Sequence, residues 1–361
     1  MTRNPLISVV MPTHNSAQFV ADAVRSVLAQ TYSPVELIVV DDGSTDETLK
    51  VLEPFRTRIK CVRQPNRGPS AARNRGIRES RGELIAFLDS DDQWLPEKLA
   101  RQWEIMQANP RVGLVHTGNL VLQQGSGKIC EPLRDCGKPS GDLSKSIFLA
   151  NPIVTSTVLV RRACLDHDHC FDENLRTCED YDLWIRLASV VEFAYVDVAL
   201  AIYRCHTHNT SRNEWVMTRD EVFVLHKQLR ANPLLPKRLG WLKVRRRLAD
   251  AYFAFGYTCH ECHAYAEANR AFRRSLTYAP WRAYTFGLWL ATLLPVNVVR
   301  YLRSLKRRLQ GNGRRHHARV SVPHLTKDGW PFPDVDGGQA PYAKPAVILG
   351  NPPPNPRLSS R

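Results

Sequence analysis

The stretch from Glu83 to Asp92 reads ELIAFLDSDD, a short apolar run that ends in three carboxylates. A second run, Val35–Val40, ends in the same way with the loop Asp41–Asp46, which reads DDGSTD. Short apolar runs of this composition are typical of buried strands. In an open α/β sheet the carboxyl ends of the strands border the ligand crevice, where carboxylates are placed to hold a divalent cation and the polyanion that it carries. The two runs therefore predict a site for a nucleotide diphosphate.

The sequence around these two runs alternates between strand patterns and helix patterns. We expect strands at residues 6–11, 35–40, 59–63 and 83–88, helices at 16–30, 70–80 and 96–108, and Ser44 or Thr45 as the cap of a further helix. Strands that alternate with crossover helices form a mostly parallel sheet. Residues 112–117, 153–160 and 193–202 are also strand-like and surround a helix at about 180–190. The predicted fold class is α/β.

Charge divides the chain into two parts. Residues 1–230 contain 28 Lys and Arg against 29 Asp and Glu, whereas residues 231–361 contain 22 against 6. The whole positive excess, a formal net charge of +15 for 361 residues, thus belongs to the C-terminal third. We predict a catalytic domain at 1–215, a basic helical extension at 216–310 and a disordered basic tail rich in Pro and Gly at 311–361.

The N-terminal region predicts a cytoplasmic protein. Its first apolar stretch, Leu6–Met11, is too short for the apolar core of a signal peptide and leads into Pro12 and Thr13. The nine cysteines show no paired spacing, which is typical of reduced thiols in a chain without an export signal.

Five motifs in a fixed order give a more specific indication. A single Asp-x-Asp motif is weak evidence, because carboxylates also occupy solvated turns. Together, however, the five motifs resemble the family 2 glycosyltransferases, which have the GT-A fold, and they span roughly residues 5–212. The motifs are Val9–Asn15, Asp41–Asp46, Arg67–Gly76, Leu88–Asp92 and Glu179–Trp184. The resemblance implies a Rossmann-like sheet and a transfer that inverts the anomeric centre.

The resemblance also assigns roles to individual residues. It makes Asp180 the catalytic base, with Glu179 beside it, and places Trp184 near the acceptor. It implies Mg²⁺ or Mn²⁺ as cofactor, with Asp91 as the direct ligand and Asp89, Asp92 and His206 around it. The residues that it places along the nucleotide sugar are Pro12, Thr13, Asn15, Asp41, Asp42, Gly68, Arg73, Asn74 and Asp89.

These roles describe a glycosyltransferase that moves a sugar from a nucleotide donor, expected to be a UDP-sugar, to an acceptor hydroxyl. The acceptor expected is a surface polysaccharide or a lipid-linked glycan. A nucleotidyltransferase also uses paired carboxylates and Mg²⁺, so it is the rival enzyme. A non-catalytic binding protein that uses the basic third is the rival of another class. The basic third lacks the aromatic-interleaved signature of a nucleic-acid-binding fold, which argues against nucleic acid as a partner.

The C-terminal third contains two further patterns. Residues 252–280 resemble one tetratricopeptide helix pair, which as a lone repeat has to pack on something else. Residues 283–299 are uncharged, and Arg303, Lys306, Arg307 and Arg308 follow soon after. An apolar helix beside a basic cluster suits either peripheral attachment to an anionic membrane on the cytoplasmic face or a helical lid over the core, and both interpretations stay open.

Overall fold

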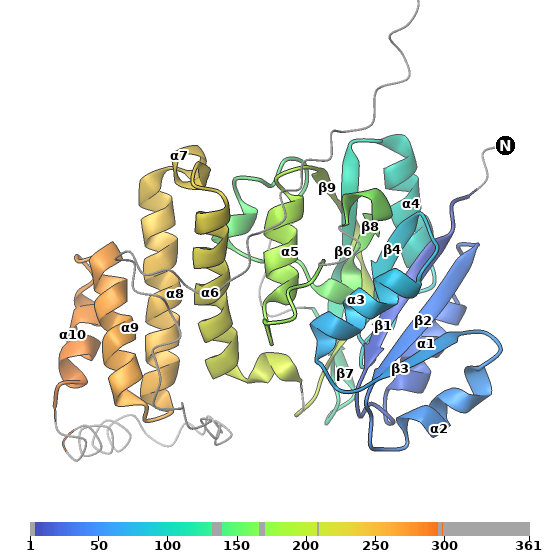
Figure 1. Cartoon of the computed structure of the whole chain (residues 1–361), viewed down its shortest axis with the longest axis horizontal. Coiled ribbons are helices and arrows are strands. Elements are labelled where there is room, and N and C mark those ends of the chain that lie inside the picture. Colours follow the sequence, from blue (N-terminus) through green and yellow to red (C-terminus); the bar gives the residue numbers. More distant parts are fainter. Residues whose placement is uncertain (1–3, 132–138, 166–169, 208, 295–297, 299–361) are drawn as a thin grey trace, which may run out of the picture. The chain divides into compact units, whose positions relative to one another are not determined.

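A mixed β-sheet forms the centre of the N-terminal part of the chain (Figure 1). The computed structural model describes residues 4–131, 139–165, 170–207, 209–294 and 298. Neighbouring strands follow the order β3-β2-β1-β4-β8-β6-β9-β5, and β7 pairs with β6 at one side. The strands are β1 (Ile7–Thr13), β2 (Val35–Asp42), β3 (Lys60–Gln64), β4 (Leu84–Phe87), β5 (Gln93–Trp94), β6 (Val112–Gln123), β7 (Lys128–Cys130), β8 (Leu159–Arg161) and β9 (Glu192–Cys205).

The first half of the sheet is parallel, as predicted, whereas the second half is mixed, because β6 and β9 pair in parallel among antiparallel neighbours. Strand β1 pairs in parallel with β2 and β4, and β2 with β3. Strand β8 then runs antiparallel to both β4 and β6, and β5 runs antiparallel to β9. Parallel neighbours need a long crossover, usually a helix. Between β6 and β8 the described residues form only β7 and short 3₁₀ turns, so the chain returns in the opposite direction.

Helices α1–α5 alternate with the strands, and helices α6–α10 follow the last strand in the chain. Gly68 is the cap residue before helix α3 and its φ of 90° lies in the left-handed region, while Pro69 is the first residue of the helix. Its Gly76 lies so close to β1 that an added Cβ would be 2.3 Å from a methyl carbon of Val10, so only glycine lets α3 pack at this depth. The helices are α1 (Val20–Leu28), α2 (Thr48–Leu52), α3 (Pro69–Glu79), α4 (Lys98–Ala108), α5 (Glu179–Leu187), α6 (Glu214–Ala231), α7 (Leu235–Leu239), α8 (Trp241–Glu261), α9 (Tyr265–Tyr278) and α10 (Ala283–Ala291).

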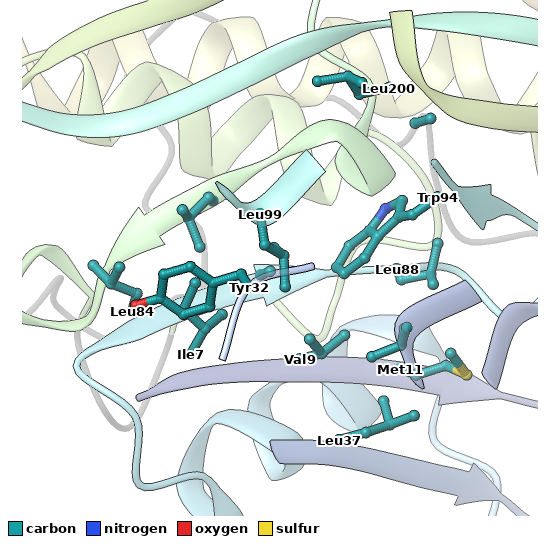
Figure 2. Packing of buried hydrophobic residues seen from close by; sticks show 14 of the residues in the cluster. Ile7, Val9, Met11, Tyr32, Leu37, Leu84, Leu88, Trp94, Leu99 and Leu200 are labelled. Carbon is teal, nitrogen blue, oxygen red and sulfur yellow. The ribbon is translucent and has the colours of Figure 1, made fainter. Parts of the chain in front are cut away.

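The main hydrophobic core lies between the sheet and the helices on one of its faces (Figure 2). Alternate residues of β1, Ile7, Val9 and Met11, point into this core and are fully buried. Trp94 and Leu99 pack against them from the other side of the cluster. Because β1 and β4 both contribute side chains to this core, their ends and the loops that follow them are held in place.

From Glu214 to Ala291 the chain is mostly helical, in agreement with the sequence pattern. Helices α6, α8, α9 and α10 lie side by side in chain order (Figure 1). Within them α8 and α9 pack closely together, at the position of the predicted tetratricopeptide-like pair. No described helix is long and apolar enough to span a bilayer. The predicted tail at 311–361 lies outside the described residues.

Helix α6 is tied to the segment that leads into α5. The buried carboxylate of Asp220 on α6 accepts hydrogen bonds from the backbone of Arg176 and Thr177 and from the Thr177 hydroxyl. Two turns later Lys227 and Gln228 bond to Asp182 of α5, whose side chain is fully buried. The helical region thus supports α5 directly, while the predicted domain boundary at 215 stays a prediction.

Candidate active site

Polar residues follow β1, β2 and β4 where these strands end. Because the three strands are parallel and adjacent, their carboxyl ends meet at one edge of the sheet. Asn15 follows β1, the loop Asp41–Asp46 closes β2, and Asp89–Asp92 follow β4. The three predicted segments therefore come together at this edge.

The loops after β1 and β2 are joined by hydrogen bonds. The backbone N–H of Asn15 donates to Ser44 Oγ at 3.0 Å, and Asn15 Oδ1 accepts from the backbone N–H of Thr45 at 2.8 Å. The prediction that Ser44 or Thr45 caps a helix was wrong. Helix α2 begins only at Thr48, and Glu47 at its cap position makes no side-chain capping bond. Ser44 and Asn15 instead fix the two loops against each other.

Pro12, Thr13 and Asp41 lie side by side across the ends of β1 and β2. Thr13 is opposite Asp41 in the strand register, and both side chains are buried. Asp41 accepts a hydrogen bond from the backbone of Ser44 and lies 3.3 Å from the guanidinium of Arg63. Thr13 Oγ1 is buried without a hydrogen-bond partner among the described residues. This hydroxyl is thus a donor that the protein itself leaves unused.

Asp42 organises the loop that leads into α3. Its Oδ1 accepts from the backbone N–H of Arg67 at 2.9 Å and from Gln64, and its Oδ2 accepts from the N–H of Gly68 at 2.7 Å. The carboxylate is 4% exposed. In this structure Asp42 therefore shapes the Arg67-Gly68 turn, and any contact with a nucleotide has to use its remaining lone pairs.

Arg73 connects two of the motifs. Its guanidinium donates to Asp89 at 2.6 Å and to Glu179 at 2.5 Å, and its side chain is 5% exposed. The neighbouring Asn74 turns away from this cluster, because its amide bonds to both the N–H and the carbonyl of Phe171. Asn74 therefore fixes the chain ahead of α5, whereas Arg73 brings the strand-end carboxylates and the start of α5 together.

The carboxylates after β4 point in different directions. Asp91 Oδ2 lies 2.9 Å from His206 Nε2 and 3.3 Å from the side-chain amide of Asn209. Burial, followed by the charge of Asp89, raises the pKa of Asp91. Asp92 is buried and accepts from the Ser156 hydroxyl and from the backbone N–H of Arg204. Of the predicted metal residues, Asp91 and His206 therefore face each other. Asp89 instead forms an ion pair with Arg73, and Asp92 is hydrogen-bonded to Ser156 and Arg204.

Asp180 lies in the first turn of α5. Cys178, at the cap position, adopts a left-handed φ of 58°, which turns the chain sharply into the helix. Asp180 Oδ2 accepts from the Thr155 hydroxyl at 2.8 Å, and Oδ1 accepts from the backbone N–H of Tyr181 at 2.6 Å. Burial raises the pKa of Asp180 and also that of Glu179. Such a carboxylate binds a proton more readily than one in water.

Trp184 is fully buried and packs edge-on near Phe171, with ring centroids 6.5 Å apart. Trp184 lies on α5 itself and has no exposed surface in this structure, and its predicted place near the acceptor stays a prediction. Sequence analysis missed Thr155 and Ser156, which contact Asp180, Asp89 and Asp92. Their signal was present, because Thr155–Thr157 interrupt the apolar stretch 153–160 with three adjacent hydroxyls.

A parallel sheet whose strand ends carry clustered carboxylates, continued by a mixed half, defines an α/β fold of the GT-A type. The sequence comparisons agree. The family described as glycosyl transferase family 2 matches residues 8–123. The putative teichuronic acid biosynthesis glycosyltransferase TuaG of Bacillus subtilis is 32% identical over 226 residues, which cover 61% of this chain and 87% of TuaG. The chain thus belongs to glycosyl transferase family 2.

One other relative is matched over a much smaller share of its own length. An uncharacterized glycosyltransferase of Rickettsia conorii is 35% identical over 200 residues, which cover 55% of this chain but only 32% of that protein. Among solved structures, S. aureus TarS 1-349 in complex with UDP-GlcNAc has a TM-score of 0.59 at 21% identity and matches 82% of this chain and 87% of that one. The mannosyltransferase PcManGT of Pyrobaculum calidifontis, in complex with GDP-Man and Mn²⁺, has a TM-score of 0.54 at 18% identity, with 84% and 88% covered. These structures establish the GT-A-like fold.

Proposed function

We propose that the protein transfers a sugar from a nucleotide-diphosphate sugar to an acceptor hydroxyl, with inversion at the anomeric carbon. The observation that carries this proposal is the bridge made by Arg73, which joins Asp89 at the strand ends to Glu179 beside Asp180. It brings a cation and a buried carboxylate to the same edge of the sheet. The cation would stabilise the negative charge of a departing diphosphate, and the carboxylate would accept the proton of an attacking hydroxyl.

Asp180 is the proposed base. To take a proton from the acceptor it has to be ionised and close to a hydroxyl, and a base works best when its pKa approaches the working pH. Burial moves the pKa of Asp180 upward, in that direction. Each of its oxygens accepts one protein hydrogen bond, which leaves lone pairs for the acceptor. A single base without a separate nucleophile leads to inversion, by analogy with inverting glycosidases.

A divalent cation fits beside Asp91 and His206. A carboxylate oxygen and an imidazole nitrogen already face each other there, and together they suit Mn²⁺ better than Mg²⁺. Among the described residues no group of three or more His, Cys, Asp or Glu side chains is arranged to hold a metal ion. We therefore propose that Asp91 and His206 hold the ion and that donor oxygens and water complete its ligands. A bound ion would supply positive charge against the charge that develops on the leaving diphosphate.

The donor and the acceptor are proposed by class. The loops at Asn15 and Asp41–Asp46 offer polar groups, including the unused Thr13 hydroxyl, along which a nucleoside can lie. We propose a UDP-sugar as donor, the class that TarS binds according to its description. We propose a growing cell-surface polysaccharide as acceptor, which agrees with the biosynthetic assignment carried in the name of TuaG.

Nucleotide release from a panel of UDP-, GDP- and TDP-sugars tests this proposal. With Mn²⁺ present, we expect the purified protein to release one nucleotide, and we expect EDTA to stop the release. Asp91→Asn is expected to raise the Mn²⁺ concentration needed for half-maximal rate by about tenfold or more, since it removes a charged ligand. Release of pyrophosphate from a nucleoside triphosphate and a sugar phosphate would instead identify a nucleotidyltransferase, and no turnover of any donor would contradict the proposal.

We also propose that α10 attaches the protein to an anionic membrane surface. Its Tyr284, Phe286 and Leu290, and Leu293 after it, are 63%, 46%, 43% and 59% exposed. No Asp or Glu occurs between Glu267 and Asp328, whereas this interval contains 13 Lys and Arg. Exposed apolar side chains in a chain segment of one positive sign complement a surface of anionic lipid.

Vesicle sedimentation tests this attachment. We expect the protein to bind phosphatidylglycerol vesicles and to be released by salt, with much less binding to pure phosphatidylcholine. Phe286→Ser combined with Leu290→Ser should weaken binding by about tenfold or more, because burying such a side chain is worth about 1.5–3 kcal/mol. Leu234→Ser is the control, since Leu234 is 60% exposed but lies before α7. Equal loss in the control, or no binding by the wild type, would refute the attachment.

A further inference from the structure

The 3₁₀ turn η3 (Thr155–Thr157) contacts two parts of the candidate site, the proposed base Asp180 and the Asp89–Asp92 segment. Its three side chains are 6%, 1% and 1% exposed, although all three are polar. Buried hydroxyls are costly unless they are hydrogen-bonded, so their partners show what the turn holds. Two of these partners are carboxylates of the site.

Thr155 holds the proposed base. Its hydroxyl donates to Asp180 Oδ2 at 2.8 Å, while the backbone N–H of Tyr181 donates to Oδ1 at 2.6 Å. One donor on each oxygen fixes both the position and the plane of the carboxylate. Without the hydroxyl, only the contact from its own helix would restrain the Asp180 side chain among the hydrogen bonds described.

Ser156 holds the segment that contains Asp91. Its hydroxyl donates to Asp92 Oδ2 at 2.5 Å and accepts from the backbone N–H of Asp89 at 3.2 Å. Its carbonyl accepts from the indole N–H of Trp94 at 2.6 Å. Asp89 precedes Asp91 in the chain and Asp92 follows it, so Ser156 is hydrogen-bonded to the loop both before and after Asp91.

The turn η3 is itself anchored by hydrogen bonds from helix α4. Gln102 on α4 donates to the carbonyls of Thr157 and Val115, both at 2.8 Å, and Lys98 donates to Gln102 Oε1 at 2.8 Å. Gln102 and Lys98 are fully buried. The position of η3 is therefore set by α4 and β6 rather than by the carboxylates that it contacts.

We propose that Thr155 and Ser156 are positioning residues that set the distance between the base and the leaving-group side of the site. The inference rests on the proposed function of Asp180 and Asp91. Successive Cα atoms are about 3.8 Å apart across a trans peptide, so two contacts made by adjacent residues cannot move independently. The carboxylates of Asp180 and Asp92, which these two residues hold, therefore keep a fixed separation.

Replacing the Thr155 hydroxyl should also change the pH dependence. The charged and titratable groups around Asp180 are Arg73 from α3, Asp89 after β4, and Glu179 and Cys178 beside it in the chain. The Thr155 hydrogen bond favours the ionised carboxylate and so lowers the pKa of Asp180 against the effect of burial. Thr155→Val removes this contribution and raises the pKa, so the acidic limb of the kcat profile should move to higher pH.

The test compares Thr155→Val, Thr155→Ser and Ser275→Ala in nucleotide-release kinetics. Thr155→Val keeps the side-chain shape and is expected to lower kcat by about tenfold to a hundredfold, the cost of a small misplacement, with the donor KM changed by less than about twofold. Thr155→Ser keeps the hydroxyl and should recover most of the rate. Ser275→Ala is the matched control, since among the described residues its buried hydroxyl bonds only to the Ala249 carbonyl in the helical region.

Ser156→Ala separates the two ends of the turn. It should raise the donor KM and the Mn²⁺ requirement more than it lowers kcat, because it releases the Asp89–Asp92 segment. Equal losses in Thr155→Val and Thr155→Ser, or losses no larger than in Ser275→Ala, would overturn the inference while leaving the proposed function intact. Wild-type protein that turns over no donor would overturn the proposed function, and the inference with it. Thr155→Ala serves as a second hydroxyl-free variant if the valine variant does not fold.

Discussion

Asp180→Asn is expected to lower kcat by about 10²–10⁴-fold, the range that a positioned general base contributes. The amide keeps the size of the side chain, and its oxygen still accepts a hydrogen bond from Thr155 or Tyr181. What it loses is the ability to take a proton at neutral pH. Donor affinity should therefore change by less than about threefold, which isothermal titration with the nucleotide sugar measures separately from the rate.

The control for this variant is Glu97→Gln. Glu97 also carries a carboxylate, but it is exposed at the cap position before α4 and pairs only with Arg101 among the contacts described. Its substitution should leave kcat unchanged within experimental error. If Asp180→Asn kept more than about a tenth of the wild-type kcat, a general-base role would not account for the position of this residue.

Arg73→Met is expected to lower the free energy of unfolding by about 3–5 kcal/mol and to abolish transfer. Arg73 is 4% exposed and is the partner of both Asp89 and Glu179. Removing one member of a buried ion pair leaves the other charge without compensation, which is more costly than losing a surface pair. Urea denaturation followed by circular dichroism measures this change at neutral pH.

Two further variants show whether the loss of stability is specific to Arg73. Arg75→Met lies two residues further along the same helix, where Arg75 is 46% exposed and pairs with Glu79, so it should cost less than about 1 kcal/mol. Arg73→Met combined with Glu179→Gln should recover part of the stability, since the second change removes the stranded charge. Similar losses for Arg73→Met and Arg75→Met would contradict the assignment of Arg73 as the bridge between the two motifs.

Much of the fold was predictable because its signals are local. The apolar runs at 35–40 and 83–88 became β2 and β4, and the carboxylates that follow them meet at one edge, as parallel strands require. The mixed half, in which β8 and β5 run antiparallel to their neighbours, was not predicted. Its pairing depends on which strands the chain returns to after β6, and no short sequence pattern encodes that choice.

The candidate site shows the same division. The fold brings together predicted site residues from distant segments. The contacts of Arg73 with Glu179 and of Asp91 with His206 each join positions more than a hundred residues apart. The three adjacent hydroxyls at 155–157 are visible in the sequence, but the roles of Thr155 and Ser156 are not, because a buried hydroxyl acquires its role only from the partner that the fold places beside it. Trp184 illustrates the reverse case, since its position in a motif did not reveal that it would be buried.

The anomeric configuration of the released sugar tests the central claim most directly. Proton NMR recorded during the first minutes of donor hydrolysis or transfer identifies the anomer that forms before mutarotation mixes the two. A single base at Asp180, with no protein nucleophile, predicts a product whose configuration is opposite to that of the donor. A product that retains the donor configuration would contradict the account, because retention requires a second displacement that this mechanism does not contain.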